Sequence, residues 1–217
     1  MNANVLATLL SFSVAPAAVI AIYKFRQCSA NYLPFLICVI LALLNEIVST
    51  FLNYWHIGNS LNANIYVLLE YWLLLWLFYR WHKNKNPWMY LVFGAGLAIE
   101  WCIETYWLNG LSQFSVIFRA LYAFIMVLLS SGQLSYLLVN QQDIHTRPRL
   151  ILCLAFLMQF SYKTFFELFF AFNIAFSTPF YRKFLLIWGI VNAISNIIYI
   201  PALLCIPQKK RYYITFS

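Results

Sequence analysis

The sequence predicts an all-α integral membrane protein, a polytopic transmembrane bundle of seven helices. Three observations carry this prediction: the chain is 64% hydrophobic, only 9% of its 217 residues are charged, and its apolar runs are long. A water-soluble domain carries about 25% charged residues. With so little charge this chain cannot cover a water-facing surface, so we expect the lipid bilayer to be its solvent.

Seven apolar runs approach the length of about 20 residues that a helix needs to cross the hydrocarbon core. We expect these helices at roughly 4–23, 33–55, 63–81, 88–107, 114–139, 150–172 and 184–206. The connections between them are too short to hold a soluble domain, which predicts a single transmembrane domain over residues 1–217. Any activity must then come from the bundle or from a partner.

The first three segments have clear boundaries. No Lys or Arg precedes the first, and it is long enough to span, so we expect a transmembrane helix and not a cleaved signal peptide. The second and third end at Trp55 and Trp81, as is typical of a membrane interface. Pro16 in the first helix and Pro201 in the seventh are expected to kink their helices.

The remaining segments are bounded by aromatic or polar stretches. Trp88 and Trp107 mark the ends of the fourth, in which Gly94, Gly96 and Ala98 form a small-residue face suited to close helix packing. The stretch QQDIHTRPR divides the fifth segment from the sixth, and NIAFSTPFYRK divides the sixth from the seventh.

The distribution of basic residues predicts the orientation of the bundle. Ten of the fourteen follow the odd-numbered helices, whereas only Arg182 and Lys183 lie in the loops on the opposite side. The ten are Lys24, Arg26, Arg80, Lys83, Lys85, Arg147, Arg149, Lys209, Lys210 and Arg211. We therefore expect the N-terminus outside and the C-terminus in the cytoplasm, in a bacterial inner (plasma) membrane. The same reading explains the net charge of +8 without a nucleic-acid partner.

Five of the six acidic residues lie inside the predicted helices: Glu46, Glu70, Glu100, Glu104 and Glu167. A carboxylate in hydrocarbon costs roughly 2.5 to 3.5 kcal/mol on insertion scales, so such residues usually face a cavity or a partner. Two basic residues, Arg119 and Lys163, also lie within spans. With the predicted directions, all these charges fall between the membrane midplane and the outer surface.

Polar residues recur at helical spacing near these charges, which predicts an outward-facing acidic chamber. The residues expected to bind a ligand or a proton are Glu46, Glu70, Glu100, Glu104, Asn192 and Asn196. Arg119, Lys163 and Glu167 are expected to form ion pairs that gate or tune the chamber, with Lys163 pairing with Glu167 one turn away. Glu100 and Glu104 are also one turn apart, so we expect one of them to hold a proton near pH 7.

Three functions fit such a chamber. We favour binding or translocation of a small polar or cationic solute, with proton coupling as a variant. One alternative is a seven-helix sensor or a subunit of a membrane complex, with a membrane-protein partner. Another is a metal-free membrane lipid hydrolase with a carboxylate pair as general acid and base, so enzyme activity stays open. The buried pairs could also serve only to lock the bundle, although two basic residues cannot neutralise five acids.

No cofactor or metal is expected. His56, His82 and His145 lie in loops without metal-ligand spacing, and the five cysteines form no CxxC pair. Seven helices with an outer N-terminus resemble the microbial rhodopsins, which hold retinal on a lysine of helix seven. That helix has no lysine within its span here, so we expect no retinal.

The second and third predicted helices carry an Asn-Glu pair followed, after a short loop, by an N…Y…LE pattern. The matching residues are Asn45, Glu46, Asn64, Tyr66, Leu69 and Glu70. In these two helices the chain resembles a loose group of uncharacterised bacterial seven-helix membrane proteins. The resemblance implies the membrane fold and no particular activity.

Overall fold

The structure is a computed structural model that describes residues 9–82, 87–108, 110, 113–139, 147–172 and 177–208. Regular secondary structure within these ranges is helical, with one isolated antiparallel bridge between Cys28 and Gln208. Residues 4–8 of the first predicted helix lie outside the described part of the chain. So do His145 and five of the basic residues that predict orientation: Lys83, Lys85, Lys209, Lys210 and Arg211.

The helices fall in the apolar runs of the sequence. In chain order they are η1 (Phe12–Val14), α2 (Ala15–Lys24), α3 (Leu33–Tyr54), α4 (Ser60–Trp81), α5 (Pro87–Ile103), η2 (Glu104–Leu108), α6 (Val116–Val139), α7 (Arg147–Ala171) and α8 (Thr178–Leu204). The short element η1 is a turn of 3-10 helix, and η2 is a π-helical turn that continues α5.

Among the described residues, six helices are long and apolar enough to cross a bilayer, from α3 to α8 with η2 counted with α5. The prediction of an all-α membrane bundle is therefore confirmed. The first apolar helix, Leu9–Lys24, is shorter than the other six. Pro16 lies at the start of α2, directly after η1. It has no N–H to donate, and in the turn before it the Phe12 carbonyl accepts the N–H of Ala15.

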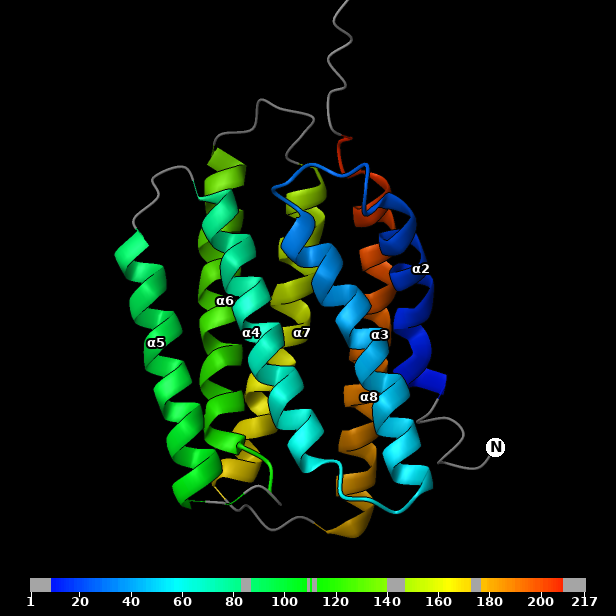
Figure 1. The fold of residues 1–217 in the computed structure, drawn as a ribbon, viewed down its shortest axis with the longest axis vertical. Helices are drawn as coiled ribbons and strands as arrows, with labels where there is room; N and C mark the ends of the chain where they lie inside the picture. Colours follow the sequence, from blue (N-terminus) through cyan, green and yellow to red (C-terminus); the bar gives the residue numbers. More distant parts are fainter. Residues whose placement is uncertain are drawn as a thin grey trace, which may run out of the picture.

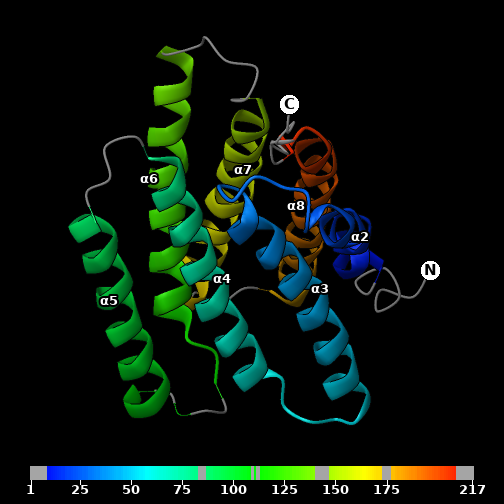
Figure 2. The same cartoon turned by 45° about the horizontal axis from the view of Figure 1, so that its top comes forward.

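Consecutive helices alternate in direction, so the connections alternate between the two ends of the bundle (Figure 1). Both views place α5 at one edge of the bundle and α2 at the other (Figures 1 and 2). Helices α6, α7 and α8 contact one another in sequence, α3 contacts α4, and α2 contacts both α3 and α8.

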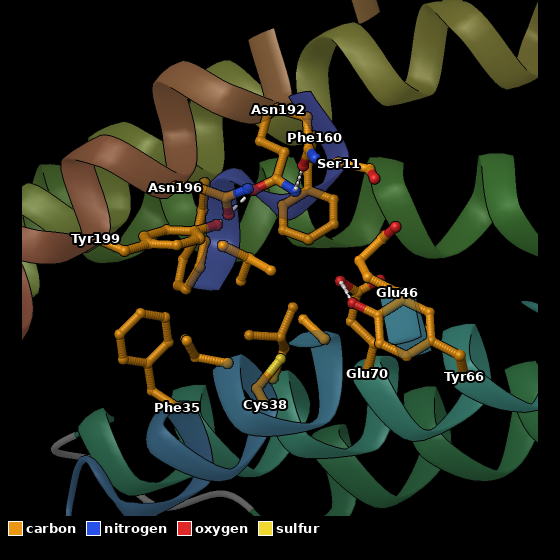
Figure 3. A pocket seen from close by; sticks show the side chains of 16 residues that line it. Ser11, Phe35, Cys38, Glu46, Tyr66, Glu70, Phe160, Asn192, Asn196 and Tyr199 are labelled. Atoms are coloured by element: carbon orange, nitrogen blue, oxygen red, sulfur yellow. Dashed lines mark hydrogen bonds between the residues drawn. The ribbon is translucent and has the colours of Figure 1, made fainter. Parts of the chain in front are cut away.

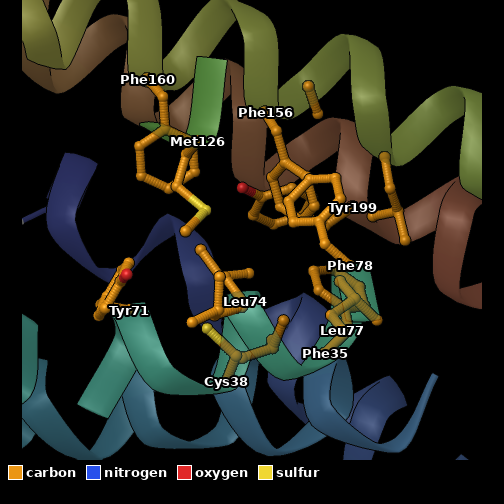
Figure 4. Close-up of a cluster of buried hydrophobic side chains, with 14 of the residues drawn as sticks. Phe35, Cys38, Tyr71, Leu74, Leu77, Phe78, Met126, Phe156, Phe160 and Tyr199 are labelled. Atoms are coloured by element: carbon orange, nitrogen blue, oxygen red, sulfur yellow. The ribbon is translucent and has the colours of Figure 1, made fainter. Parts of the chain in front are cut away.

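Aromatic rings fill the space between α3 and α4 on one side and α7 and α8 on the other (Figure 4). Phe35 of α3 packs edge-on against Phe156 of α7 and Tyr199 of α8, with centroid distances of 5.9 and 5.2 Å. Phe78 of α4 contacts Phe156 as well, at 6.0 Å. Such pairs contribute about 0.5 to 1.5 kcal/mol beyond area burial. Within a membrane, packing of this kind drives helix association because lipid is as apolar as the helices.

Large apolar side chains point outward from the bundle. Each of the following is at least half exposed: Phe51, Val92, Phe124, Phe165 and Ile197. Large exposed apolar side chains in such number are unfavourable in water, whereas lipid tails solvate them well. The outer surface therefore agrees with an integral membrane protein in a lipid bilayer.

On the predicted small-residue face of α5, one of the two glycines allows close packing against α4. A Cβ on Gly94 would lie 2.7 Å from the Cη2 atom of Trp72 on α4, whereas a Cβ on Gly96 would meet nothing within 4 Å. Tyr71 of α4 also donates a 2.7 Å hydrogen bond to the carbonyl of Phe93. Gly94 thus lets α5 approach α4 closely, while Gly96 faces outward.

Candidate functional site

A cavity of about 60 Å³ lies at the centre of the bundle, between α3, α4, α7, α8 and the segment that precedes α2. Its polar lining residues are Ser11, Glu46, Tyr66, Glu70, Gln159, Asn192, Asn196 and Tyr199. Figure 3 shows Glu46, Glu70 and Tyr66 on the side of α3 and α4, with Asn192, Asn196 and Tyr199 across from them. One water needs roughly 10 to 15 Å³ on this measure, so the cavity has room for a small solute or a few waters.

Helical spacing explains why these residues converge on one point. Side chains three or four residues apart lie on the same face of a helix. The sets that face the cavity are Cys38, Ala42 and Glu46 on α3, Tyr66, Glu70 and Leu74 on α4, Phe156, Gln159 and Phe160 on α7, and Asn192, Asn196 and Tyr199 on α8. On α3, α4 and α7 the cavity-facing set combines polar and apolar residues, whereas on α8 all three are polar.

Glu70 is the carboxylate of the cavity with the most partners. Its Oε1 accepts a 3.1 Å hydrogen bond from the Tyr66 hydroxyl, and its Oε2 accepts a 2.6 Å bond from Tyr122. The ammonium group of Lys163 lies 3.3 Å from the same Oε2 and also contacts the Tyr122 hydroxyl. Glu70 is only 6% exposed, so these three donors compensate a carboxylate that has lost its water.

The ion pairs differ from the predicted ones. Lys163 was expected to pair with Glu167, but its partner is Glu70, while Glu167 pairs with Arg119 at 3.7 Å. An i,i+4 ion pair on a helix is weaker when the Lys precedes the Glu than in the reverse order. Lys163 therefore gains little from Glu167 and is available to Glu70 on α4. The Arg119 guanidinium also lies over the ring of Phe114, 4.9 Å from its centroid. Arg119, Lys163 and Glu167 form a second layer beside the cavity and do not line it.

Glu46 has a different environment. The hydroxyl of Ser11 donates a hydrogen bond to its carboxylate. Within the described part of the chain, the ion pairs are Lys163–Glu70 and Arg119–Glu167, and Glu46 belongs to neither. Glu46 therefore lines the cavity with a hydroxyl donor and without a basic side chain to balance its charge.

Amide side chains hold the opposite wall together. The amide of Asn196 donates a 2.9 Å hydrogen bond to Ser13, just before α2. Gln159 donates to the side-chain oxygen of Asn192 at 3.3 Å and accepts a hydrogen bond from the Tyr199 hydroxyl. These bonds join α7, α8 and the segment before α2 around the cavity.

Glu104 lies elsewhere: it is the first residue of η2, and its side chain reaches the start of α6. Its two carboxylate oxygens accept hydrogen bonds from the backbone N–H groups of Ile117 and Phe118, at 2.9 and 2.8 Å. These are N–H groups of the first turn of α6, which have no partner within the helix and sit at the positive end of its dipole. The Asn64 side chain accepts from the N–H of Ser115 at 3.1 Å, which completes the cap.

The structure therefore divides the six residues predicted to bind a ligand or a proton. It brings Glu46, Glu70, Asn192 and Asn196 to one cavity, whereas Glu100 and Glu104 do not line it. One oxygen of Glu100 is buried without a hydrogen-bond partner among the described residues.

Four polar residues of the cavity were not predicted as ligands from the sequence: Ser11, Tyr66, Gln159 and Tyr199. Tyr66, Gln159 and Tyr199 are bonded to the predicted residues or to one another, and helical spacing from Glu70 and Asn196 was the available signal. Ser11 gave no signal, because an isolated serine in an apolar helix is common.

An apolar layer separates the cavity from the end of the bundle at which α4 ends and α3 begins. Phe35, Leu77, Phe78 and Phe156 form this layer, and none of them is more than 2% exposed (Figure 4). A polar solute in the cavity would have to displace these rings to pass toward that end.

No group of three or more His, Cys, Asp or Glu side chains in the described ranges is arranged to hold a metal ion. Comparison of the chain with protein-family models, with curated proteins and with solved structures finds no match. The fold and the outward apolar surface define a helical integral membrane protein with a small acidic cavity in its core.

Proposed function

We propose that this protein binds a small cationic solute in the central cavity, with Glu46 as the principal ligand. The observation that carries this proposal is the contrast in charge balance: Glu70 has Lys163, whereas Glu46 faces the cavity without a basic partner among the described residues. An uncompensated carboxylate in an apolar interior is costly, so a cation beside it restores the balance.

The other cavity residues fit this role. Asn192 and Asn196 supply neutral amide groups opposite the carboxylates, and Glu70 supplies a second negative charge. A cation that approaches Glu70 competes with Lys163 for the Glu70 carboxylate. Release of Lys163 from this ion pair is a route by which cation binding is coupled to proton movement. Arg119 and Glu167 then set the position of Lys163 as neighbouring charges. We assign Glu104 to capping α6.

The proposal includes the predicted orientation. The cavity lies near the middle of the helices, and Arg119, Lys163 and Glu167 lie between it and the end at which α3 joins α4. Seven spans with an outer N-terminus and a cytoplasmic C-terminus, in a bacterial inner membrane, would open this end to the outside. A reporter fused to the C-terminus checks this orientation, and its signal is expected inside the cell. A signal from outside the cell would show that the bundle has the opposite orientation.

The apolar layer beneath the cavity favours a second candidate, a sensor or membrane-complex subunit. Such a protein binds its solute and contacts a partner without passing the solute through, so it needs no polar path across the bundle. Uptake by proteoliposomes distinguishes this from translocation. The lipid hydrolase has little support, because ligand pockets for larger molecules span roughly 300 to 1,000 Å³ and this cavity has about 60 Å³.

A thermal-shift screen of the purified protein tests the proposal. A ligand that binds only the folded state stabilises it by about 2.7 kcal/mol at 100 times its Kd. The panel contains alkali cations, ammonium, guanidinium and small alkylamines, with chloride constant. We expect a cation to raise the melting temperature of the wild type and of Glu104→Gln, but not of Glu46→Gln.

Two outcomes would overturn this function. One is that no cation in the panel shifts the melting temperature of the wild type. The other is that Glu46→Gln responds to the cation as strongly as the wild type does.

A further inference from the structure

A second cavity, of about 340 Å³, lies between α4, α5 and α6. Both cavities border α4, but they have no lining residue in common. It is lined by Phe78, His82, Met89, Tyr90, Leu128, Leu129, Gly132, Gln133 and Tyr136. These residues belong to the last turns of α4 and α6 and to the first turn of α5. The second cavity is therefore at the end of the bundle that lies beyond the apolar layer, away from the carboxylates.

The walls of this cavity are apolar and aromatic, with one buried carboxamide. Gln133 is 6% exposed, and its amide nitrogen is buried without a hydrogen-bond partner among the described residues. A buried polar group left without a partner costs about 1 to 3 kcal/mol, so a ligand that offers an acceptor at this point is favoured. The hydroxyl of Tyr90, by contrast, donates to the carbonyl of Phe78 at 3.4 Å.

The cavity also has open space beside Gly132. Gly132 lines the cavity, and a Cβ built on it meets nothing within 4 Å, so a larger side chain there has open space to occupy. A volume of about 340 Å³ falls within the range of roughly 300 to 1,000 Å³ that ligand pockets occupy. The space is thus large enough for part of an organic molecule.

We propose that this cavity holds an acyl chain of a glycerophospholipid, whose ester carbonyl accepts a hydrogen bond from Gln133. The cavity lies beside α5, the helix at one edge of the bundle (Figure 2). It is within a few turns of the helix ends, the depth at which the ester groups lie outside a hydrocarbon core about 30 Å thick. Arg80, in the last turn of α4, and Arg149, in the first turn of α7, lie at the same end of the bundle and attract a phosphate group.

Native mass spectrometry of the full-length protein tests this site. The protein is delipidated in detergent and then mixed with dioleoylphosphatidylglycerol. Gly132→Leu fills the hollow, and Gln133→Leu removes the donor while keeping the apolar wall. Gly96→Leu is the matched control, because Gly96 has equally open space on an exposed face of α5 and does not line the cavity.

We expect the wild type and Gly96→Leu to retain one phospholipid under activation that strips the others. Gln133→Leu should retain it about five- to tenfold less, as expected for the loss of one hydrogen bond. Gly132→Leu should lose it. If Gly132→Leu does not fold, Gln133→Leu still decides the result. Equal retention in Gln133→Leu and Gly96→Leu would overturn the proposal, as would a wild type that retains no phospholipid or a different molecule such as an isoprenoid quinone.

Discussion

Glu46 and Glu104 lie in the same apolar bundle, yet their surroundings differ completely. The side chain of Glu104 caps α6, where two backbone N–H groups donate to its two oxygens at 2.9 and 2.8 Å. Glu46 faces a cavity with the Ser11 hydroxyl as a donor and with no ion-pair partner in the described residues. One carboxylate completes the fold, and the other remains available to something that enters the cavity.

Glu70 is intermediate between these two extremes. It lines the cavity like Glu46, but Tyr66, Tyr122 and Lys163 surround its carboxylate as fully as the backbone surrounds Glu104. The comparison teaches that an acidic residue in an apolar helix is not in itself a ligand site. What decides its role is how many donors the fold has already placed around it.

The largest effect is expected where a buried charge loses its partner. Lys163→Met leaves the Glu70 carboxylate buried without a cation, which destabilises by about 3 kcal/mol or more. Thermal or denaturant unfolding in detergent measures the loss. Adding Glu70→Gln should recover much of it, because the double variant has no unpaired buried charge.

Lys183→Met is the matched control for that variant, since Lys183 is exposed in the first turns of α8. It should leave the unfolding transition nearly unchanged. An equal effect of Lys163→Met and Lys183→Met would contradict the assignment of Lys163 to Glu70.

A smaller effect separates the two contrasted glutamates. Glu104→Gln keeps one acceptor oxygen and loses the charge, so it should destabilise by about 1 to 2 kcal/mol through the weakened cap. Glu46→Gln should leave stability within about 1 kcal/mol of wild type, or raise it, because it removes a poorly compensated charge. Parallel unfolding curves of the two variants check this order, and a more destabilised Glu46→Gln would reverse the comparison.

The smallest effect concerns the packing of α5. Gly94→Ala places a methyl group 2.7 Å from the far edge of the Trp72 ring, which has to move, so we expect a loss of about 1 kcal/mol. Gly96→Ala adds the same methyl group in open space and should be neutral or slightly stabilising. Melting temperatures of the pair measure the difference, and equal values would show that α5 does not depend on this close approach.

The helices were predictable from the sequence because a spanning helix needs a long apolar run and these runs are separated by polar or aromatic boundaries. The segment expected at 33–55 is a helix from Leu33 to Tyr54, and the one expected at 63–81 runs from Ser60 to Trp81. The first helix was less predictable. Its apolar run gives no sign of the 3-10 turn before Pro16.

The candidate site was predictable only in part. Spacing along one helix shows which residues share a face, and this was enough to propose Glu46, Glu70, Asn192 and Asn196 together. It does not show which face meets which neighbouring helix, so Lys163 was assigned to Glu167 on its own helix. Glu104 begins a π-helical turn, which breaks the regular repeat that would have placed it beside Glu100 on one face.

Carbodiimide labelling is the measurement that tests the central contrast most directly. Dicyclohexylcarbodiimide partitions into membranes and modifies carboxyl groups that can take up a proton, and mass spectrometry of the digested protein locates the label. The account predicts that Glu46 is labelled first and that Glu104 is protected by its two backbone donors. A cation that binds the cavity should slow labelling of Glu46. Labelling of Glu104 as fast as Glu46, or no labelling of Glu46, would contradict the claim that the fold leaves Glu46 available for a ligand.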